Sequence, residues 1–338
     1  MMRALLIIAA FLVSAPPRAN TAEAERAYFT GKTVRMIVGY GPGGGYDAYA
    51  RMIAPYLGKF LGATILVENQ PGAGGLIALN RIYAAPPDGL LMMLVNGTGA
   101  AMSQLTEQSG ARFDLSRLNF LGTVTVSPRM WMVGPDSPLR TPQVAMTFDR
   151  KINWAASGPT DGSSDGASFT CEALKLQCRI VLGYGSSNLA ALSVARGEMD
   201  SFYLYDTSAD SYVKAGSGKV IAAMGRERSR FFPEIATIFE QVQLNADQQW
   251  LFDFRTALDN LGRILVAAPD TPPARLAYLR AALKASLTDP GLVAEAERTH
   301  RYINYLDAET TRRTAVTIVT GITPEQKKMV RDIVAKAR

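Results

Sequence analysis

The fold of this chain is decided by residues 33–47, which read TVRMIVGYGPGGGYD. Residues 33–39 form a short apolar run with β-branched side chains, which is typical of a buried strand. A glycine loop follows, and residues 48–61 (AYARMIAPYLGKFL) carry apolar side chains at helical spacing. A strand, a glycine loop and a helix in this order are the first unit of a parallel sheet covered by helices.

The same alternation continues along the chain and predicts two α/β units. The first unit is expected to continue with strands at 64–68 and 90–95 and a helix at 76–84. Four prolines within 126–142 indicate a crossing into the second unit, and a return crossing is expected after 226–233. The elements expected in the second unit are strands at 152–156, 179–182, 199–203 and 220–224 and helices at 166–176 and 189–196.

After the return crossing, a strand at 262–268 and helices at 273–287 and 324–336 are expected to close the first unit. We therefore expect a discontinuous first lobe of residues 25–128 plus 230–338 and a second lobe of residues 129–229. Two α/β lobes joined by two crossings are the plan of a hinge-bending binding protein, with the ligand in a cleft between the lobes.

Residues 1–24 have the composition of a secretory signal peptide. They combine a basic start at Arg3, an apolar run over 4–13 and a small, polar, proline-containing tail. The apolar run is too short for a membrane-spanning helix. Cleavage is possible after Ala15 or nearer Ala22 or Ala24, and a buried N-terminal helix or strand is the alternative. We expect an exported protein of the periplasm.

The charged and metal-binding residue types exclude several functions. The net charge is +6, but the basic residues are scattered and form no stripe with interleaved aromatics, so nucleic acid is not an expected partner. His300 is the single histidine of the chain, which argues against Ser-His-Asp or Cys-His catalysis and against a histidine-rich metal site. We expect a monomeric protein that is no enzyme and has no metal and no cofactor.

The two cysteines, Cys171 and Cys178, are candidates for a disulfide in an oxidising compartment. On one continuous helix their Cα atoms would be about 10 Å apart, from a rise of 1.5 Å per residue. A disulfide tolerates a Cα separation of up to about 7 Å. The pair can therefore form only if the helix ends between them, near Leu176 and Gln177, and the sequence leaves both outcomes open.

The glycine loop also fits G-x-G-x-x-G at Gly39, Gly41 and Gly44, with Glu68 at the end of the next strand. This pattern offers an NAD-dependent oxidoreductase as an alternative. The expected export, Pro42 inside the loop and the lack of a hydride-transfer motif argue against it. The more general interpretation is an anion site, because glycines allow close approach and a helix N-terminus near Asp47 presents free N–H groups. Asp47 itself is expected to be the N-cap.

Three segments together resemble a known family. Residues 41–51 (GPGGGYDAYAR), 67–75 (VENQPGAGG) and 87–89 (PDG) look like the Bug family, the periplasmic solute receptors of tripartite tricarboxylate transporters. A weaker similarity continues from 150 to 290. The resemblance implies an α/β fold of the type II periplasmic-binding-protein kind, with two lobes that close on a small carboxylic acid and deliver it to a membrane transporter. A receptor that reports its ligand to a membrane signalling protein is the alternative.

The resemblance also implies which loops hold the ligand. The expected contacts of the first lobe are Tyr40, Gly41, Pro42, Gly43, Gly44, Gly45, Tyr46, Asp47, Asn96, Gly97 and Thr98. The expected contacts of the second lobe are Ser157, Gly158, Ser163, Ser164, Tyr184, Gly185, Ser186, Tyr205 and Asp206.

The chain departs from the family pattern at positions that bear on the ligand. It has Asp165-Gly166-Ala167-Ser168 where the family has a histidine, and Tyr46 where a small residue is common. Asp161 and Asp165 could repel a second carboxylate or bind a cationic group. The identity of the acid is therefore left open.

Overall fold

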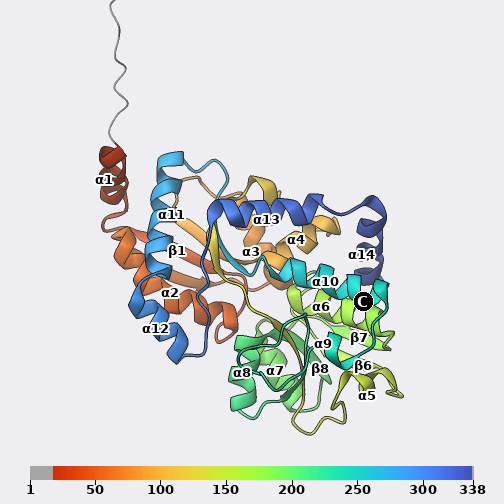
Figure 1. The fold of residues 1–338 in the computed structure, drawn as a ribbon. Coiled ribbons are helices and arrows are strands. Elements are labelled where there is room, and N and C mark those ends of the chain that lie inside the picture. Colours follow the sequence, from red (N-terminus) through yellow and green to blue (C-terminus); the bar gives the residue numbers. More distant parts are fainter. Residues whose placement is uncertain (1–17, 337–338) are drawn as a thin grey trace, which may run out of the picture.

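The computed structural model describes residues 18–336, which build two β-sheets with helices packed against them (Figure 1). Residues 1–17 hold most of the expected signal peptide and lie outside the described residues. Helix α1 (Arg18–Phe29) runs through the expected cleavage positions at Ala22 and Ala24. Within the described residues, no helix combines the length and the apolar character that a bilayer crossing requires.

The first sheet has the strand order β11-β4-β10-β3-β1-β2. Strands β1, β2 and β3 are parallel, as the sequence predicted, whereas β10 inserts antiparallel between β3 and β4. The strands are β1 (Thr33–Val38), β2 (Thr64–Asn69), β3 (Leu91–Asn96), β4 (Asn119–Thr125), β10 (Arg263–Ala267) and β11 (Leu306–Asp307).

Helices cover both faces of this sheet because its strands are apolar on both sides. Val34, Met36 and Val38 of β1 belong to one buried cluster, and Ile37 belongs to another. The helices on the face of Met36 are α1, α2 (Gly45–Leu61), α11 (Pro273–Leu287) and α12 (Pro290–Arg298). Those on the face of Ile37 are α3 (Leu76–Tyr83), α4 (Gly97–Leu105) and α13 (Ala308–Thr320). Two short 3-10 turns, η1 (Ala73–Gly75) and η2 (Leu115–Arg117), complete this part.

The second sheet has the strand order β7-β6-β8-β5-β9, with β5 antiparallel to both of its neighbours. Its strands are β5 (Arg129–Val133), β6 (Ile152–Ala155), β7 (Cys178–Val181), β8 (Ser201–Tyr205) and β9 (Lys219–Ala223). Residues 129–133 were expected within a crossing, but they form a fully buried strand because the neighbouring prolines lie outside its ladder.

Helix α6 (Gly162–Leu174) packs on one face of the second sheet, and α7 (Ser187–Ala195) and α8 (Asp206–Lys214) pack on the other. The remaining helices of this region are α5 (Pro142–Met146), α9 (Ile238–Gln241), α10 (Ala246–Asp259) and α14 (Pro324–Lys336). The sequence did not predict α10, and it assigned α14 to the first lobe. Both helices pack against α6 (Figure 1).

Two short crossings join the sheets and lie side by side. The chain leaves β4 at Thr125 and enters β5 at Arg129, and it returns from α10 to β10 at residues 260–262. Thr125 pairs with Arg263, so the crossings start from adjacent strands. The return therefore comes later than the expected 226–233. One buried cluster spans both sheets and includes Val95 of β3 and Trp154 of β6.

The structure confirms the disulfide between Cys171 and Cys178, whose Cα atoms are 6.2 Å apart. Helix α6 ends at Leu174, because Lys175 adopts a left-handed conformation with φ 55°. The chain then turns into β7, which begins at Cys178. The helix end that the pairing required is thus present, two residues earlier than expected.

Candidate functional site

The glycine loop after β1 leads into α2, whose N-cap is Gly44 rather than Asp47. Asp47 lies in the first turn, and its carboxylate accepts hydrogen bonds from the Gly43 backbone N–H and from Arg51 Nε, both at 2.9 Å. Burial raises the pKa of Asp47, but the hydrogen bonds from Arg51 and Gly43 outweigh it, so the pKa lies below the usual value. Asp47 therefore holds the loop onto its own helix.

Loops from both sheets meet around a small cavity. The Gly41 N–H donates to the Gly185 carbonyl at 2.7 Å, and the Gly45 N–H donates to Ser187 Oγ at 3.3 Å. On another side, Ser103 Oγ and Thr160 Oγ1 share a hydrogen bond of 2.6 Å. These bonds connect segments far apart in the sequence, so they hold the two sheets in a closed arrangement.

The residues that line this cavity come from both sheets and from the loops and helices that follow their strands. Those expected from the sequence are Tyr40, Gly44, Gly45, Tyr46, Asn96, Ser157, Ser163 and Tyr205. Asp161, which the sequence analysis weighed for its charge, and Ser187, from the expected contact loop at 184–188, also line the cavity. Those that the sequence analysis missed are Arg129, Phe202, Tyr203, Leu204, Ser208 and Arg263.

The other expected contacts lie outside the lining. Gly41 and Gly185 bond to each other, and Pro42 and Gly43 are exposed at the rim. Four more expected residues, Asp47, Thr98, Ser164 and Asp206, form hydrogen bonds within the protein and do not line the cavity. The other expected residues that do not line it are Gly97, Gly158, Tyr184 and Ser186. Gly97 and Asp206 were expected in loops, but they are the first residues of α4 and α8.

The buried carboxylate of Asp206 is hydrogen-bonded to groups of the protein itself. It accepts hydrogen bonds from Ser229 Oγ and Tyr302 Oη, each at 2.7 Å, and from the Thr207 N–H at 2.6 Å. Burial raises its pKa, although these hydrogen bonds oppose the shift. The side chain thus anchors the start of α8 to the segment around Tyr302.

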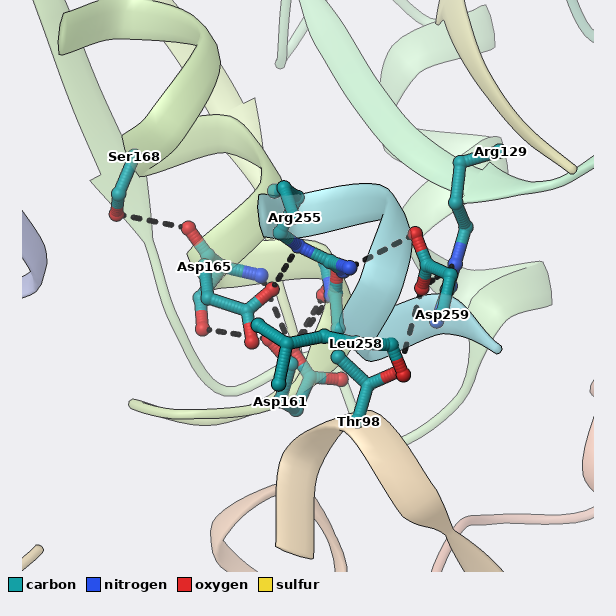
Figure 2. Close-up of polar contacts among 12 residues, drawn as sticks. Thr98, Arg129, Asp161, Asp165, Ser168, Arg255, Leu258 and Asp259 are labelled. Carbon is teal, nitrogen blue, oxygen red and sulfur yellow. Dashed lines mark hydrogen bonds and ion pairs between the residues drawn. The ribbon is translucent and has the colours of Figure 1, made fainter. Parts of the chain in front are cut away.

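A buried network of two arginines and two aspartates lies beside the cavity (Figure 2). Arg255 Nε contacts Asp165 Oδ1 at 2.9 Å, and Arg255 Nη1 contacts Asp259 Oδ2 at 2.8 Å. Asp259 Oδ1 also accepts from Arg129 Nε at 2.8 Å and from Thr98 Oγ1 at 3.2 Å. The network therefore links α4, α6, α10 and β5, and it fixes the guanidinium of Arg129 at the cavity wall.

Asp165 is the weakly ionised member of this network. It is fully buried, and burial raises its pKa to about 7, although the neighbouring charge of Arg255 lowers it. Its contact with Arg255 shows that this carboxylate serves the protein itself. Asp165 is not among the residues that line the cavity, so the two functions considered for it from the sequence, repelling a second carboxylate and binding a cation, stay predictions.

The cavity wall presents several buried donors that have no hydrogen-bond partner among residues 18–336. They are Tyr46 Oη, Tyr205 Oη, Arg129 Nη2 and the three guanidinium nitrogens of Arg263. Burial raises the pKa of Tyr46 and of Tyr40 well above the usual value, so both phenols keep their protons. A set of buried donors with positive charge suits an anion with several oxygen atoms.

Arg263 is the most unusual of these residues. It is fully buried on β10, at the end of a crossing, and its guanidinium carbon lies 4.0 Å from the ring centre of Tyr205 and 4.4 Å from that of Tyr49. A cation–π contact stabilises such a charge by about 0.5–2 kcal/mol. The desolvation of a buried ion costs several kcal/mol, so the rings offset only part of that cost.

Neither cavity arginine was predicted as a site residue from the sequence. Arg129 and Arg263 each stand at the start of an apolar strand, where an isolated basic residue usually marks the solvent-exposed end. The available signal was the position of both at the ends of crossings, since ligands of two-lobed proteins bind between the lobes.

No group of three or more histidine, cysteine, aspartate or glutamate side chains in the described part of the chain is arranged to hold a metal ion. The loop amides that a dinucleotide phosphate would need are engaged with protein groups, as the bonds of Gly41, Gly43 and Gly45 show.

Comparison with known proteins agrees with this architecture. Among solved structures, periplasmic binding protein BugD superposes with a TM-score of 0.74 at 20% identity, covering 89% of this chain and 97% of that chain. MatC of Rhodopseudomonas palustris with bound malate gives a TM-score of 0.71 at 20% identity, covering 90% and 99%. A second R. palustris protein, with adipate, gives 0.74 at 16% identity, covering 90% and 97%. These similarities establish a periplasmic-binding-protein fold.

The sequence comparisons identify the family. A UPF0065 protein of Bordetella pertussis is 24% identical over 298 residues, which cover 87% of this chain and 86% of the relative. Protein BugT of the same organism is 22% identical over 251 residues, which cover 71% and 74%. Residues 49–315 match the family described as tripartite tricarboxylate transporter family receptor. The chain therefore belongs to this family, whose members are receptors rather than enzymes, and it has a periplasmic-binding-protein fold.

Proposed function

We propose that this protein captures a small carboxylate between two lobes and delivers it to a membrane transporter of the tripartite tricarboxylate type. The observation that carries the proposal is the set of unpaired buried donors from Tyr46, Tyr205, Arg129 and Arg263 around one cavity between the sheets. The family supports the transporter partner. Malate and adipate in two structural neighbours support the ligand class.

We propose residues 126–128 and 260–262 as the hinge between the lobes. This moves residues 230–259 from the first lobe expected from the sequence (25–128 plus 230–338) to the second (129–229). Helices α10 and α14 rest on α6, so they would move with the second lobe. The ligand contacts in this proposal are the expected residues that line the cavity, together with Arg129, Ser187, Ser208 and Arg263.

Affinity in the micromolar range requires about 8 kcal/mol. A charge-assisted hydrogen bond contributes about 1.5–3 kcal/mol, so several donors have to bind together. The donors lie on both sides of the cleft. The hydrogen bonds of Gly41 with Gly185 and of Ser103 with Thr160 join the two lobes directly. Tight binding therefore requires closure, and the transporter would recognise the closed form.

The proposed place of action is the periplasm, after removal of a signal peptide in the first 24 residues, and the proposed acting form is a monomer. A receptor for a membrane signalling protein would bind the same ligand, and the structure favours neither partner by a specific contact.

Thermal unfolding against a panel of carboxylates, with NAD as a control, tests the ligand class. A ligand at 1,000 times its dissociation constant stabilises the folded state by about 4 kcal/mol and raises the midpoint by several degrees. Protein that has been unfolded and refolded first carries no retained ligand. Shifts with acids and none with NAD are expected; a flat panel would contradict the proposal. Uptake of a labelled acid by vesicles that contain the transporter, with and without this protein, tests delivery.

A further inference from the structure

The charge of Arg263 differs from that of the other buried arginines of the site. Arg129 and Arg255 each contact an aspartate oxygen at 2.8 or 2.9 Å. Arg263 is 0% exposed, forms no ion pair within the described residues, and has no hydrogen-bond acceptor there for Nε, Nη1 or Nη2. Burying a guanidinium without a hydrogen-bond acceptor opposes folding, and an anionic ligand that supplies the acceptor would offset this cost.

The guanidinium of Arg263 faces the start of α2. A Cβ atom added to Gly45 would lie 3.3 Å from Arg263 Nη2 and 2.6 Å from Ser208 Oγ. Gly45 is the first residue of α2, and its lack of a side chain lets Ser208 and the Arg263 guanidinium lie close to the positive end of the helix. One carboxylate fits this chemistry, since a guanidinium binds both of its oxygens in parallel.

The rest of the cavity does not suit a second carboxylate. Asp161 lines the wall, and its Oδ1 caps α6 by accepting from the backbone N–H groups of Ser163 and Ser164, both at 3.1 Å. A second ligand carboxylate would lie in the field of this charge. The remaining wall combines the aromatic rings of Tyr40, Tyr46, Phe202, Tyr203 and Tyr205 with the uncharged polar side chains of Asn96, Ser157, Ser163, Ser187 and Ser208.

We propose that Arg263 binds the ligand carboxylate directly, and that the cavity selects monocarboxylates with a compact apolar or aromatic body over dicarboxylates. This inference rests on the proposed function of the cleft. It gives the site a specificity-determining residue that the sequence did not indicate. Arg129 adds one N–H, but its charge is already paired with Asp259.

Isothermal titration of refolded protein tests the inference with hexanoate, benzoate, their neutral amides and the dicarboxylate adipate as probes. Wild-type protein should bind at least one monocarboxylate about 10-fold or more tightly than its amide, and hexanoate more tightly than adipate. Arg263→Gln should weaken binding of the acid about 100-fold, which corresponds to losing one buried ion pair, and should leave the amide unaffected. Arg263→Lys keeps the charge but loses the two-point contact, so its affinity for the acid should lie between those of the wild type and Arg263→Gln.

Arg117→Gln removes an exposed arginine of η2 and serves as the control, with wild-type affinities expected. The unfolding midpoint of ligand-free Arg263→Gln should equal or exceed that of the wild type, since a buried charge without a hydrogen-bond acceptor is removed. A lower midpoint with unchanged affinity for the acid would assign Arg263 a structural role and overturn the inference. Equal binding of acid and amide, or a preference for adipate, would overturn it as well.

Different outcomes would contradict the proposed function and the role of Arg263. If the wild type binds no acid, both the proposed function and this inference are wrong. If it binds acids and both Arg263 variants bind them equally well, the receptor function stands and the inference alone is wrong. The lysine variant keeps the test valid if the glutamine variant does not fold.

Discussion

Gly158 lies where the two lobes touch, and replacing it with alanine should prevent full closure. A Cβ atom at Gly158 would lie 2.3 Å from Gly74 N and 2.5 Å from Ala73 C, whereas real Cβ contacts stay beyond about 3.0 Å. The opposing atoms belong to the backbone of η1 and cannot rotate away. The two loops would have to separate by at least 3.0 − 2.3 = 0.7 Å.

The effect on affinity follows from the neighbouring bonds. A separation of 0.7 Å would lengthen the Ser103–Thr160 hydrogen bond from 2.6 to about 3.3 Å and strain other contacts across the cleft. Losing one or two such bonds costs about 1–2 kcal/mol, at about 1 kcal/mol each. We therefore expect Gly158→Ala to bind its carboxylate about 5- to 30-fold more weakly than the wild type.

Isothermal titration measures this loss, and small-angle X-ray scattering measures whether ligand still makes the particle more compact. Gly225→Ala is the matched control, because a Cβ atom there would meet Thr256 at an ordinary 3.5 Å. Both variants should keep the ligand-free unfolding midpoint, since opening the cleft relieves the conflict at Gly158. Wild-type affinity together with wild-type compaction in Gly158→Ala would refute the reasoning.

Two further predictions concern stability. Replacing Cys171 and Cys178 with serine removes a cross-link over a sequence separation of 7 and should lower the free energy of unfolding by about 2 kcal/mol; an unchanged urea midpoint would contradict this. Burial raises the pKa of Asp165 from 3.8 to about 7, so the folded state holds this proton more tightly than the unfolded state, and stability should fall as pH rises through 7. From this group we expect a loss of about 1 kcal/mol between pH 6 and pH 8, measured by urea unfolding, which Asp165→Asn should lack.

Much of the fold was predictable because local pattern and global structure agree. The runs at β1 and β3 are mostly buried, β2 is a partly exposed edge strand, and helices alternate with all three, so periodicity predicted both their type and their order. Strand β5 was not recognised because prolines surround it. Those prolines lie beside the strand, where they leave its hydrogen bonds intact. Helix α10 was missed because its polar residues include Arg255 and Asp259, which are buried in mutual ion pairs rather than exposed.

The site was predictable in part. Two expected loops line the cavity: the glycine loop after β1 with Gly44 and Gly45, and the loop between β6 and α6 with Ser157, next to Ser163 of α6. Their neighbours Gly41 and Gly185 instead join the two lobes, since the closed arrangement consumes their backbone groups. Asp47 was predicted as the cap of α2 but acts from the third helical position, because Gly44 already occupies the N-cap.

The sequence by itself determined the α/β alternation, the glycine-rich edge of a cleft and a family resemblance, because each depends on residues close together in the chain. It also limited the disulfide of Cys171 and Cys178 to a helix end between them. Only the tertiary structure decided which charges meet in the cavity. Arg129 and Arg263 come from strands of different sheets, and whether a buried charge is paired depends on distances between segments more than 100 residues apart. Charge pairing acts over a few ångströms in space, and a one-dimensional pattern does not contain that distance.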